Sequence, residues 1–344
     1  MERFIMQDLI AWKNREDRKP LILLGARHVG KTYILKEFGQ REFENVAYIN
    51  CDNNAMVKDL FATDYNIERI LLTIGAITGV NIQAGKTLII MDEIQELHRG
   101  LASLKYFCEE AREYHVAVAG SLLGLTLHQG ESYPVGKANT LEMFPMTYEE
   151  FLLARGFKQR VDLLQSGMWD VVNSLRTLYI QHLREYYLVG GMPEAVKKFI
   201  DTNDANAVRE VQKEILHAYE KDISKHAPDE QVVRINQVWN SIPSQLAKEN
   251  KKFIYGVVKQ GARAKDYELA IQWLIDAGLI YKISRVKTIG MPLKIHEDIS
   301  AFKLYLLDCG LLGAMSNTPP ALLLLPNNCL LYTSPSPRDY AASR

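Results

Sequence analysis

Residues 21–32, LILLGARHVGKT, limit the fold of this chain more than any other stretch. The four aliphatic residues at its start lack polar alternation, which is typical of a strand buried on both faces of a sheet. Gly25 and Gly30 then allow the backbone to turn sharply, and a helical segment follows from Lys31. A buried strand, a tight loop and a helix in this order predict a parallel, doubly wound α/β sheet.

The loop at residues 25–32 matches the pattern G-x-x-x-x-G-K-[ST]. Its backbone N–H groups and the positive end of the following helix can surround phosphates, so Lys31 is expected to pair with the β- and γ-phosphates and the Thr32 hydroxyl to bind Mg²⁺. The alternative is a glycine-rich turn with a solvated lysine, and His28 is expected to point to solvent. The residues predicted to contact the nucleotide are Gly25, Ala26, Arg27, His28, Val29, Gly30, Lys31, Thr32 and Tyr33.

An acidic pair, Asp92 and Glu93, follows a second buried run at residues 87–91. Ligands of α/β sheets bind at the carboxyl ends of the strands, where this pair is expected. Asp92 is predicted to hold Mg²⁺ through water, and Glu93 to polarise the attacking water as a catalytic residue beside Lys31. The alternative is two solvated acids that cap the next helix.

Two further polar residues are weaker candidates. Ser121 ends the predicted strand HVAVAGS, where it could sense the γ-phosphate or orient water, or equally cap a helix. Lys137 precedes the weaker predicted strand at 140–144. In a homo-oligomer its amine could reach a neighbouring subunit's phosphate, and a solvated loop lysine is the alternative.

The rest of the chain divides by its pattern of apolar residues. Helical periodicity dominates after the sheet, and beyond it three helical segments precede two strand-like pieces, which is the order of a winged helix. The predicted parts are a leading helix at 1–16, a phosphate-loop core at 17–146, a helical part at 147–227, a winged-helix part at 228–315 and a tail at 316–344.

The segment GGMPEAV at 190–196 lies inside the helical part. Gly190 and Gly191 permit a sharp turn, Pro193 suits the first helical position, and Glu194 suits the positive start of a helix. These residues favour a hinge or a packing element over a nucleotide contact.

The predicted tail is rich in Pro, Ser and small residues, which predicts disorder. Its segment CLLYTSPSPRD resembles a translated sequencing adapter, so we expect the natural protein to continue differently beyond about residue 328.

Bulk composition excludes several classes of protein. Lys plus Arg and Asp plus Glu both number 41, so no global charge attracts nucleic acid or a membrane. The four cysteines show no C-x-x-C spacing, which argues against a zinc cluster or a disulfide framework. Because neither a signal peptide nor a run of about 20 apolar residues is present, a cytoplasmic protein without a membrane partner is expected.

Local charge still leaves a place for DNA. Between residues 248 and 294 there are ten Lys or Arg and four Asp or Glu, a local net charge of +6. Lys259, Arg263 and Lys265 gather at the start of the expected recognition helix, which favours phosphate contact. The alternative is a solvated face on a winged helix that serves only for packing.

The loop, the Asp92–Glu93 pair, the Gly-Ser turn at 120–121, YYLVGGMPEAV and FKLYLLDCGLL together resemble a family over residues 5–315. It comprises prokaryotic AAA-type ATPases that join an ATPase core and helical lid to a winged helix and, usually, a nuclease-like C-terminal domain, which we expect to be truncated in this sequence. The resemblance implies Mg²⁺-dependent hydrolysis of ATP coupled to motion of lid and winged helix, and the choice of ATP rests on it alone. Family members usually have Arg where Lys137 stands, and a lysine lacks the planar fork that clamps phosphate oxygens. The rival hypothesis is a nucleotide-gated switch that binds DNA or protein with little turnover.

Overall fold

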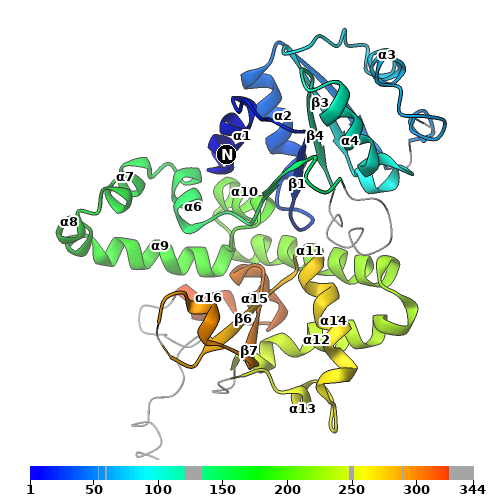
Figure 1. Cartoon of the computed structure of the whole chain (residues 1–344). Coiled ribbons are helices and arrows are strands. Elements are labelled where there is room, and N and C mark those ends of the chain that lie inside the picture. The colour runs from blue at the N-terminus through cyan, green and yellow to red at the C-terminus, as the bar shows by residue number, and fades with distance from the viewer. Residues whose placement is uncertain (53, 59, 121–133, 248–251, 289, 325–344) are drawn as a thin grey trace, which may run out of the picture. The chain divides into compact units, whose positions relative to one another are not determined.

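The computed structural model describes residues 1–344 except 53, 59, 121–133, 248–251, 289 and 325–344. The chain forms two compact units, Met1–Phe144 and Pro145–Arg344 (Figure 1). Within the described residues, no helix is both long and apolar enough to span a membrane.

The first unit is built on a parallel sheet of five strands in the order β2-β3-β4-β1-β5. The parallel α/β sheet predicted from the sequence is confirmed, including its weaker fifth strand. β4 lies between β1 and β3, so the strand before the phosphate loop and the strand before the acidic pair are not direct neighbours. The strands are β1 (Leu21–Leu24), β2 (Asn45–Asn50), β3 (Thr87–Asp92), β4 (His115–Ala119) and β5 (Asn139–Glu142).

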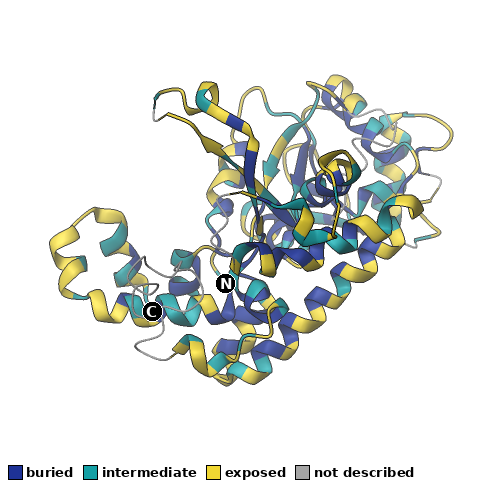
Figure 2. Ribbon diagram, turned by 90° about the horizontal axis from the view of Figure 1, so that it is seen from below, coloured by how far each residue is buried: buried dark blue, intermediate teal, exposed yellow. Residues whose placement is uncertain are grey.

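Helices cover both faces of this sheet. Side chains of β3 alternate between the faces: Ile89 joins an apolar cluster with Phe107 of α4 and Ile74 of α3, whereas Leu88 lies on the other face against Gly39 of α2. Every residue of β3 and β4 is buried, as the dark blue strands of Figure 2 show. The helices are α1 (Ile5–Lys13), α2 (Lys31–Glu42), α3 (Ile67–Thr78) and α4 (Gly100–Glu110), with a short 3₁₀ turn η1 (Ile94–Glu96) after β3.

The second unit begins with helices and continues with the predicted order of three helices and an antiparallel hairpin. Its first helices are α6 (Tyr148–Ala154), α7 (Lys158–Ser166), α8 (Trp169–Ser174), α9 (Arg176–Val189), α10 (Pro193–Thr202) and α11 (Ala205–His226). They are followed by α12 (Asp229–Ala247), α13 (Tyr255–Val258), α14 (Ala264–Asp276), β6 (Ile280–Val286), the 3₁₀ turn η2 (Leu293–His296), β7 (Glu297–Leu306), α15 (Cys309–Met315) and α16 (Pro320–Leu324).

The turn between α9 and α10 forms a packed joint rather than an open connection. Asp308, which caps α15, accepts hydrogen bonds from the backbone N–H of Gly191 at 2.6 Å and of Leu311 at 2.9 Å. A Cβ on Gly190 would lie 2.1 Å from the Asp308 carboxylate, and one on Gly191 would lie 2.1 Å from the carbonyl oxygen of Met146. We call these contacts the glycine–aspartate joint. Of the two roles expected for this turn, the contacts favour packing.

The expectation of disorder from residue 316 onward is wrong for residues 316–324. Arg209 donates from Nη2 to the carbonyl oxygen of Thr318 at 3.2 Å, and α16 packs against α9. The buried Arg209 and the contacts of α16 with α9 could not be read from the composition of the tail. The adapter-like segment from residue 329 lies outside the described residues.

Candidate nucleotide site

The loop between β1 and α2 curves because two positions accept only glycine. Gly25 has φ +145°, and a Cβ there would lie 2.3 Å from the carbonyl oxygen of Met143. Gly30 caps α2 in the left-handed region at φ +100°. His28 also has a positive φ of 66°, which costs a residue with a side chain about 1 kcal/mol, and its imidazole is exposed as expected. The two glycines therefore turn the backbone toward the start of α2.

Arg3 links this loop to the end of the first unit. Its buried guanidinium donates from Nη1 to the carbonyl oxygen of Val29 at 3.0 Å and from Nη2 to that of Phe144 at 2.7 Å. Val29 itself is fully buried. This contact was not predicted, since an arginine near the start of an amphipathic segment is ordinary.

Lys31 is the buried cation of the loop. Its Nζ donates to the carbonyl oxygens of Gly25 at 2.8 Å and of Ala26 at 2.9 Å. Burial lowers the pKa of Lys31 to about 8, while the nearby carboxylates of Glu93 and Asp92 oppose this shift. The charged amine is thus held at an energetic cost, which an anion bound beside it would relieve.

Asp92 brings the acidic strand to the loop. Its Oδ2 accepts hydrogen bonds from the Thr32 hydroxyl at 2.5 Å and from the Tyr48 hydroxyl at 3.2 Å. Burial, and then the Asp92 charge, raises the pKa of Tyr48 to about 12, so the phenol stays protonated and donates. Two oxygen donors predicted to act at the metal, Thr32 and Asp92, are therefore adjacent. Tyr48 was missed in the sequence, where it is one apolar-type residue of strand β2.

Glu93 leaves β3 in an unusual backbone conformation. Its φ of 54° and ψ of 46° are left-handed, which turns the chain into η1. Oε2 of Glu93 accepts a hydrogen bond from Nε2 of Gln95 at 2.6 Å. The charge of Glu93 opposes the lowering of the Lys31 pKa by burial, and Gln95 is a partner that no sequence motif indicated.

The remaining candidates lie apart from this group or outside the described residues. Ser121 is outside them. Nζ of Lys137 forms an ion pair with Glu109 at 2.9 Å, whose hydrogen bond and charge raise the lysine pKa. Lys259, Arg263 and Lys265 are exposed in the second unit, before and at the start of α14.

Two family models match the chain over different segments. Residues 17–152 match the family described as AAA domain. This segment is thus similar to AAA domains, and its parallel five-stranded sheet with flanking helices fits the fold of a P-loop NTPase. Residues 180–322 match a family described as a domain of unknown function, DUF8612, and this segment contains the whole of α10 to α15. No curated protein matches the chain.

Solved structures resemble the chain at low sequence identity. The Walker-type ATPase PABY2304 of Pyrococcus abyssi matches with a TM-score of 0.56 and 16% identity, over 92% of this chain and 95% of its own. At this identity, the likeness concerns the fold alone. The Orc1 protein of Aeropyrum pernix, solved with DNA, matches with a TM-score of 0.33 at 14% identity, covering 93% of this chain and 92% of its own. The RuvB branch migration motor of Thermotoga maritima matches with a TM-score of 0.37 at 15% identity, covering 82% of this chain and 89% of its own.

Proposed function

We propose that this chain binds ATP with Mg²⁺ at the loop between β1 and α2 and hydrolyses it to ADP and phosphate. The observation that carries the proposal is the 2.5 Å hydrogen bond between Thr32 and Asp92. It brings the phosphate loop and the acidic strand to one place although β4 separates their strands. The AAA domain match over residues 17–152 supports the same activity.

The residues present suit a triphosphate. The left-handed Gly30 opens α2, a helix of 12 residues whose first N–H groups have no partner inside the helix. Such a helix start favours anions, and the buried amine of Lys31 adds a full positive charge. The close approach of Gly25 to Met143 leaves this curvature to glycine alone.

The residues also suit Mg²⁺. The metal prefers oxygen ligands and usually takes only one or two from the protein, with phosphates and water completing its shell. The Thr32 hydroxyl and the Asp92 carboxylate provide such oxygens, and the described residues contain no cluster of three or more His, Cys, Asp or Glu that would form a self-sufficient metal cage. When bound, Mg²⁺ would neutralise charge on the transferred phosphoryl group.

The side chains then divide the work. Lys31 would neutralise phosphate oxygens, Thr32 and Asp92 would orient the metal, and Glu93 would accept the proton of the attacking water. The hydrogen bond from Gln95 to Oε2 of Glu93 leaves further lone pairs of the carboxylate for this proton. Ser121 and Lys137, the latter acting in trans in a homo-oligomer, would complete the site as secondary contributors.

Hydrolysis would be coupled to motion in the second unit. In this proposal, α6 to α11 act as the lid, and α12 to α14 with β6 and β7 act as a winged helix whose order of elements fits that module. The second candidate function is a nucleotide-gated DNA-binding switch. It is favoured by the exposure of Lys259, Arg263 and Lys265.

Glu93→Gln is the test that separates the two candidates. The substitution keeps the shape and the contact with Gln95 but removes the base, so we expect ATP affinity within about twofold of wild type and turnover lower by about 10²- to 10⁴-fold. Titration of a fluorescent ATP analogue gives affinity, and phosphate release gives turnover. Glu96→Gln, at an exposed acid of the adjoining 3₁₀ turn, is the matched control. Equal turnover in wild type and Glu93→Gln would contradict hydrolysis at this residue.

The DNA function has its own test. Binding of a labelled duplex should weaken as salt rises and should weaken further when Lys259, Arg263 and Lys265 are replaced by Ala. DNA binding that changes with bound ATP while turnover stays negligible would favour the switch over the ATPase.

A further inference from the structure

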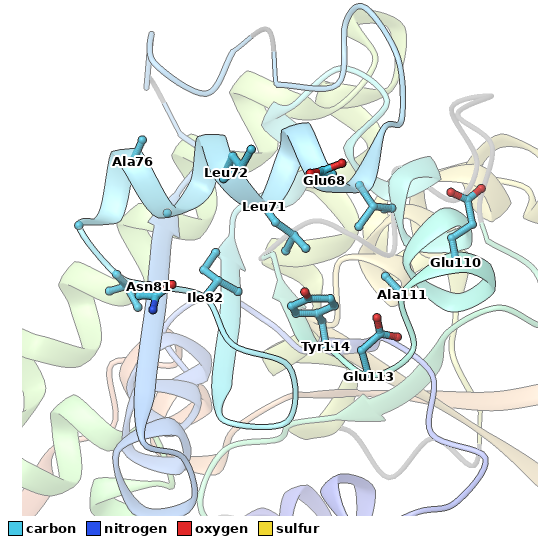
Figure 3. A pocket seen from close by; sticks show the side chains of 14 residues that line it. Glu68, Leu71, Leu72, Ala76, Asn81, Ile82, Glu110, Ala111, Glu113 and Tyr114 are labelled. Atoms are coloured by element: carbon cyan, nitrogen blue, oxygen red, sulfur yellow. The ribbon is translucent and has the colours of Figure 1, made fainter.

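A groove lies on the first unit between α3, the turn at residues 79–82, and the end of α4 with the residues that follow it up to Tyr114. Its volume is about 640 Å³, within the range of roughly 300–1,000 Å³ that ligand sites occupy. Figure 3 shows Leu71 of α3 facing Tyr114 across it, with Ile82 beside them. None of these residues takes part in the proposed ATP chemistry.

The wall made by α3 presents two ridges of a helix to this groove. Ile67 and Leu71 form one ridge at a spacing of four residues, and Leu72 with Ala76 forms the next at the same spacing. Residues four apart share a helix face, and such ridges pack into the grooves of another helix. The core uses only Ile70 and Ile74 fully, whereas Leu72 is 69% exposed. Ile67 and Leu71 pack partly against the core, so the apolar surface of α3 that the first unit leaves uncovered is carried chiefly by Leu72 and Ala76.

The shape of the groove is fixed by the chain itself. Gly79 ends α3 in the left-handed region at φ +68°, which returns the backbone along the helix. A Cβ on Gly75 would lie 3.1 Å from the carbonyl oxygen of Val80, so helix and returning segment are in close contact. A preformed groove of this kind loses little entropy when it binds a ligand.

The charges that line this apolar groove have one sign. Glu68, Glu110 and Glu113 line it, and no lysine or arginine does so among the described residues. Two nearby cations are engaged elsewhere: Arg69 pairs with Asp64, and Arg112 donates to the carbonyl oxygen of Cys108. A ligand that covers the apolar wall would therefore meet three carboxylates.

We propose that this groove binds a helical segment of a partner protein that carries an apolar stripe bordered by Lys or Arg. The stripe would pack on Leu71, Leu72 and Tyr114, and the cations would pair with the three glutamates. α3 spans 12 residues, or about 18 Å, which matches about three turns of a partner helix. Recognition by apolar anchors at intervals of three and four residues is the usual mode of a helix in a groove.

A designed peptide tests the chemistry of the occupant. The probe is a fluorescent peptide of roughly 14 residues, about 20 Å as a helix, made of Leu and Lys with Leu at positions i, i+3, i+4 and i+7. One control peptide has the same composition with the Leu positions scrambled, and another has Glu in place of Lys. Fluorescence anisotropy with the full chain should show binding of the probe, which weakens as salt rises, and about tenfold weaker binding of both controls. Equal binding of the three peptides would overturn the proposal.

Variants then locate the binding site. Leu72→Asp and the combined Glu68→Lys, Glu110→Lys, Glu113→Lys chain should each weaken probe binding by about tenfold or more. The matched control combines Glu2→Lys and Glu16→Lys, two exposed acids outside the groove, and should bind as wild type does. Circular dichroism melts confirm that each variant is folded, which is expected because the altered side chains are exposed. Unchanged binding by both folded groove variants would refute the site.

A second copy of the chain is the competing occupant. Sedimentation velocity of wild type and Leu72→Asp distinguishes it. If wild type self-associates and Leu72→Asp abolishes that association, the groove serves contacts between copies and the partner proposal fails. If the two chains sediment alike, the partner proposal is supported.

Discussion

Two glycine-rich turns in this molecule precede helices, and the N–H groups of the two turns have different partners. In the first unit, Gly25 and Gly30 curve the chain toward a helix start that begins with Lys31. In the second unit, Gly190 and Gly191 lead to a helix that begins with Pro193, and the N–H of Gly191 is bonded to Asp308. The first turn offers a cation and N–H groups for an external anion. The second is satisfied by a carboxylate from its own chain, which makes it a structural joint.

The comparison teaches that glycine spacing alone does not identify a binding site. Both turns exclude a Cβ through contact with a backbone carbonyl oxygen, at 2.3 Å for Gly25 and 2.1 Å for Gly191. What distinguishes them is whether the chain supplies the anion. The predictions below test this distinction, beginning with the largest effect.

Replacing Lys31 with Met should remove the cation that an external anion requires. Loss of one partner from a buried charged contact costs about 2–5 kcal/mol, so ATP affinity should fall by roughly thirtyfold to several thousandfold. Equilibrium titration with a fluorescent ATP analogue measures this. Lys86→Met is the control, because Lys86 is an exposed lysine of the first unit that pairs with Glu44 and contacts none of the site residues named above. Unaltered affinity in Lys31→Met would remove the basis for the nucleotide site.

Gly191→Ala should disrupt the joint without touching the loop. Its Cβ would meet the backbone of Met146, which cannot move aside as a side chain can, so we expect a loss of about 3 kcal/mol in the unfolding free energy of the second unit. Gly256→Ala is the matched control, since Gly256, like Gly191, has no positive φ, and a Cβ there would meet only a side-chain carbon of Ile254 at 4.0 Å. Urea unfolding followed by tryptophan fluorescence compares them. Equal losses in the two variants would mean that the close contact with Met146 does not decide the choice of glycine at position 191.

Asp308→Asn should weaken the same joint from the other side. The amide cannot accept both hydrogen bonds that the carboxylate receives from Gly191 and Leu311, and a buried donor left without its partner costs about 1–3 kcal/mol. Urea unfolding should show this loss with ATP affinity unchanged. A folded Asp308→Asn chain that loses nucleotide affinity would contradict a purely structural role.

Whereas the two joint substitutions lower the free energy of unfolding, Lys31→Met should raise it by about 1–3 kcal/mol at pH 7. The folded chain releases the Lys31 proton at a pKa of about 8, whereas the unfolded chain holds it to about 10.5. The unfolded state therefore binds more protons between these values, so wild type should gain stability relative to Lys31→Met as the pH rises from 8 to 10.5. Urea unfolding at several pH values measures the difference. A constant difference would mean that Lys31 is not buried at a cost.

Local patterns in the sequence were sufficient for much of the fold. The runs LILL, TLIIMD and HVAVA have no polar alternation, and each became a buried strand of the parallel sheet. The order of strands could not be foreseen, because β4 separates β1 from β3 through contacts between segments far apart in the chain. The tail was misjudged from composition, since the contact of Arg209 with Thr318 is not visible in it.

The candidate site shows the same division. The loop and the acidic pair follow from motifs whose spacing is local, and their placement together agrees with the expected geometry, while their catalytic roles stay predictions. Tyr48, Gln95 and Arg3 were missed. Tyr48 reaches Asp92 because β2 and β3 are paired neighbours in the sheet. Arg3 precedes β1 in the sequence, whereas its partner Val29 follows β1. Neither contact leaves a periodic signal in the sequence.

The two hydrogen bonds of Arg3 join the third residue of the chain to Val29 and to Phe144, the last residue of the first unit. The curvature of the loop therefore depends on segments that are both late and early in synthesis. A ribosome-bound chain that has not yet released Phe144 would lack one of the two bonds that hold Arg3 under the loop.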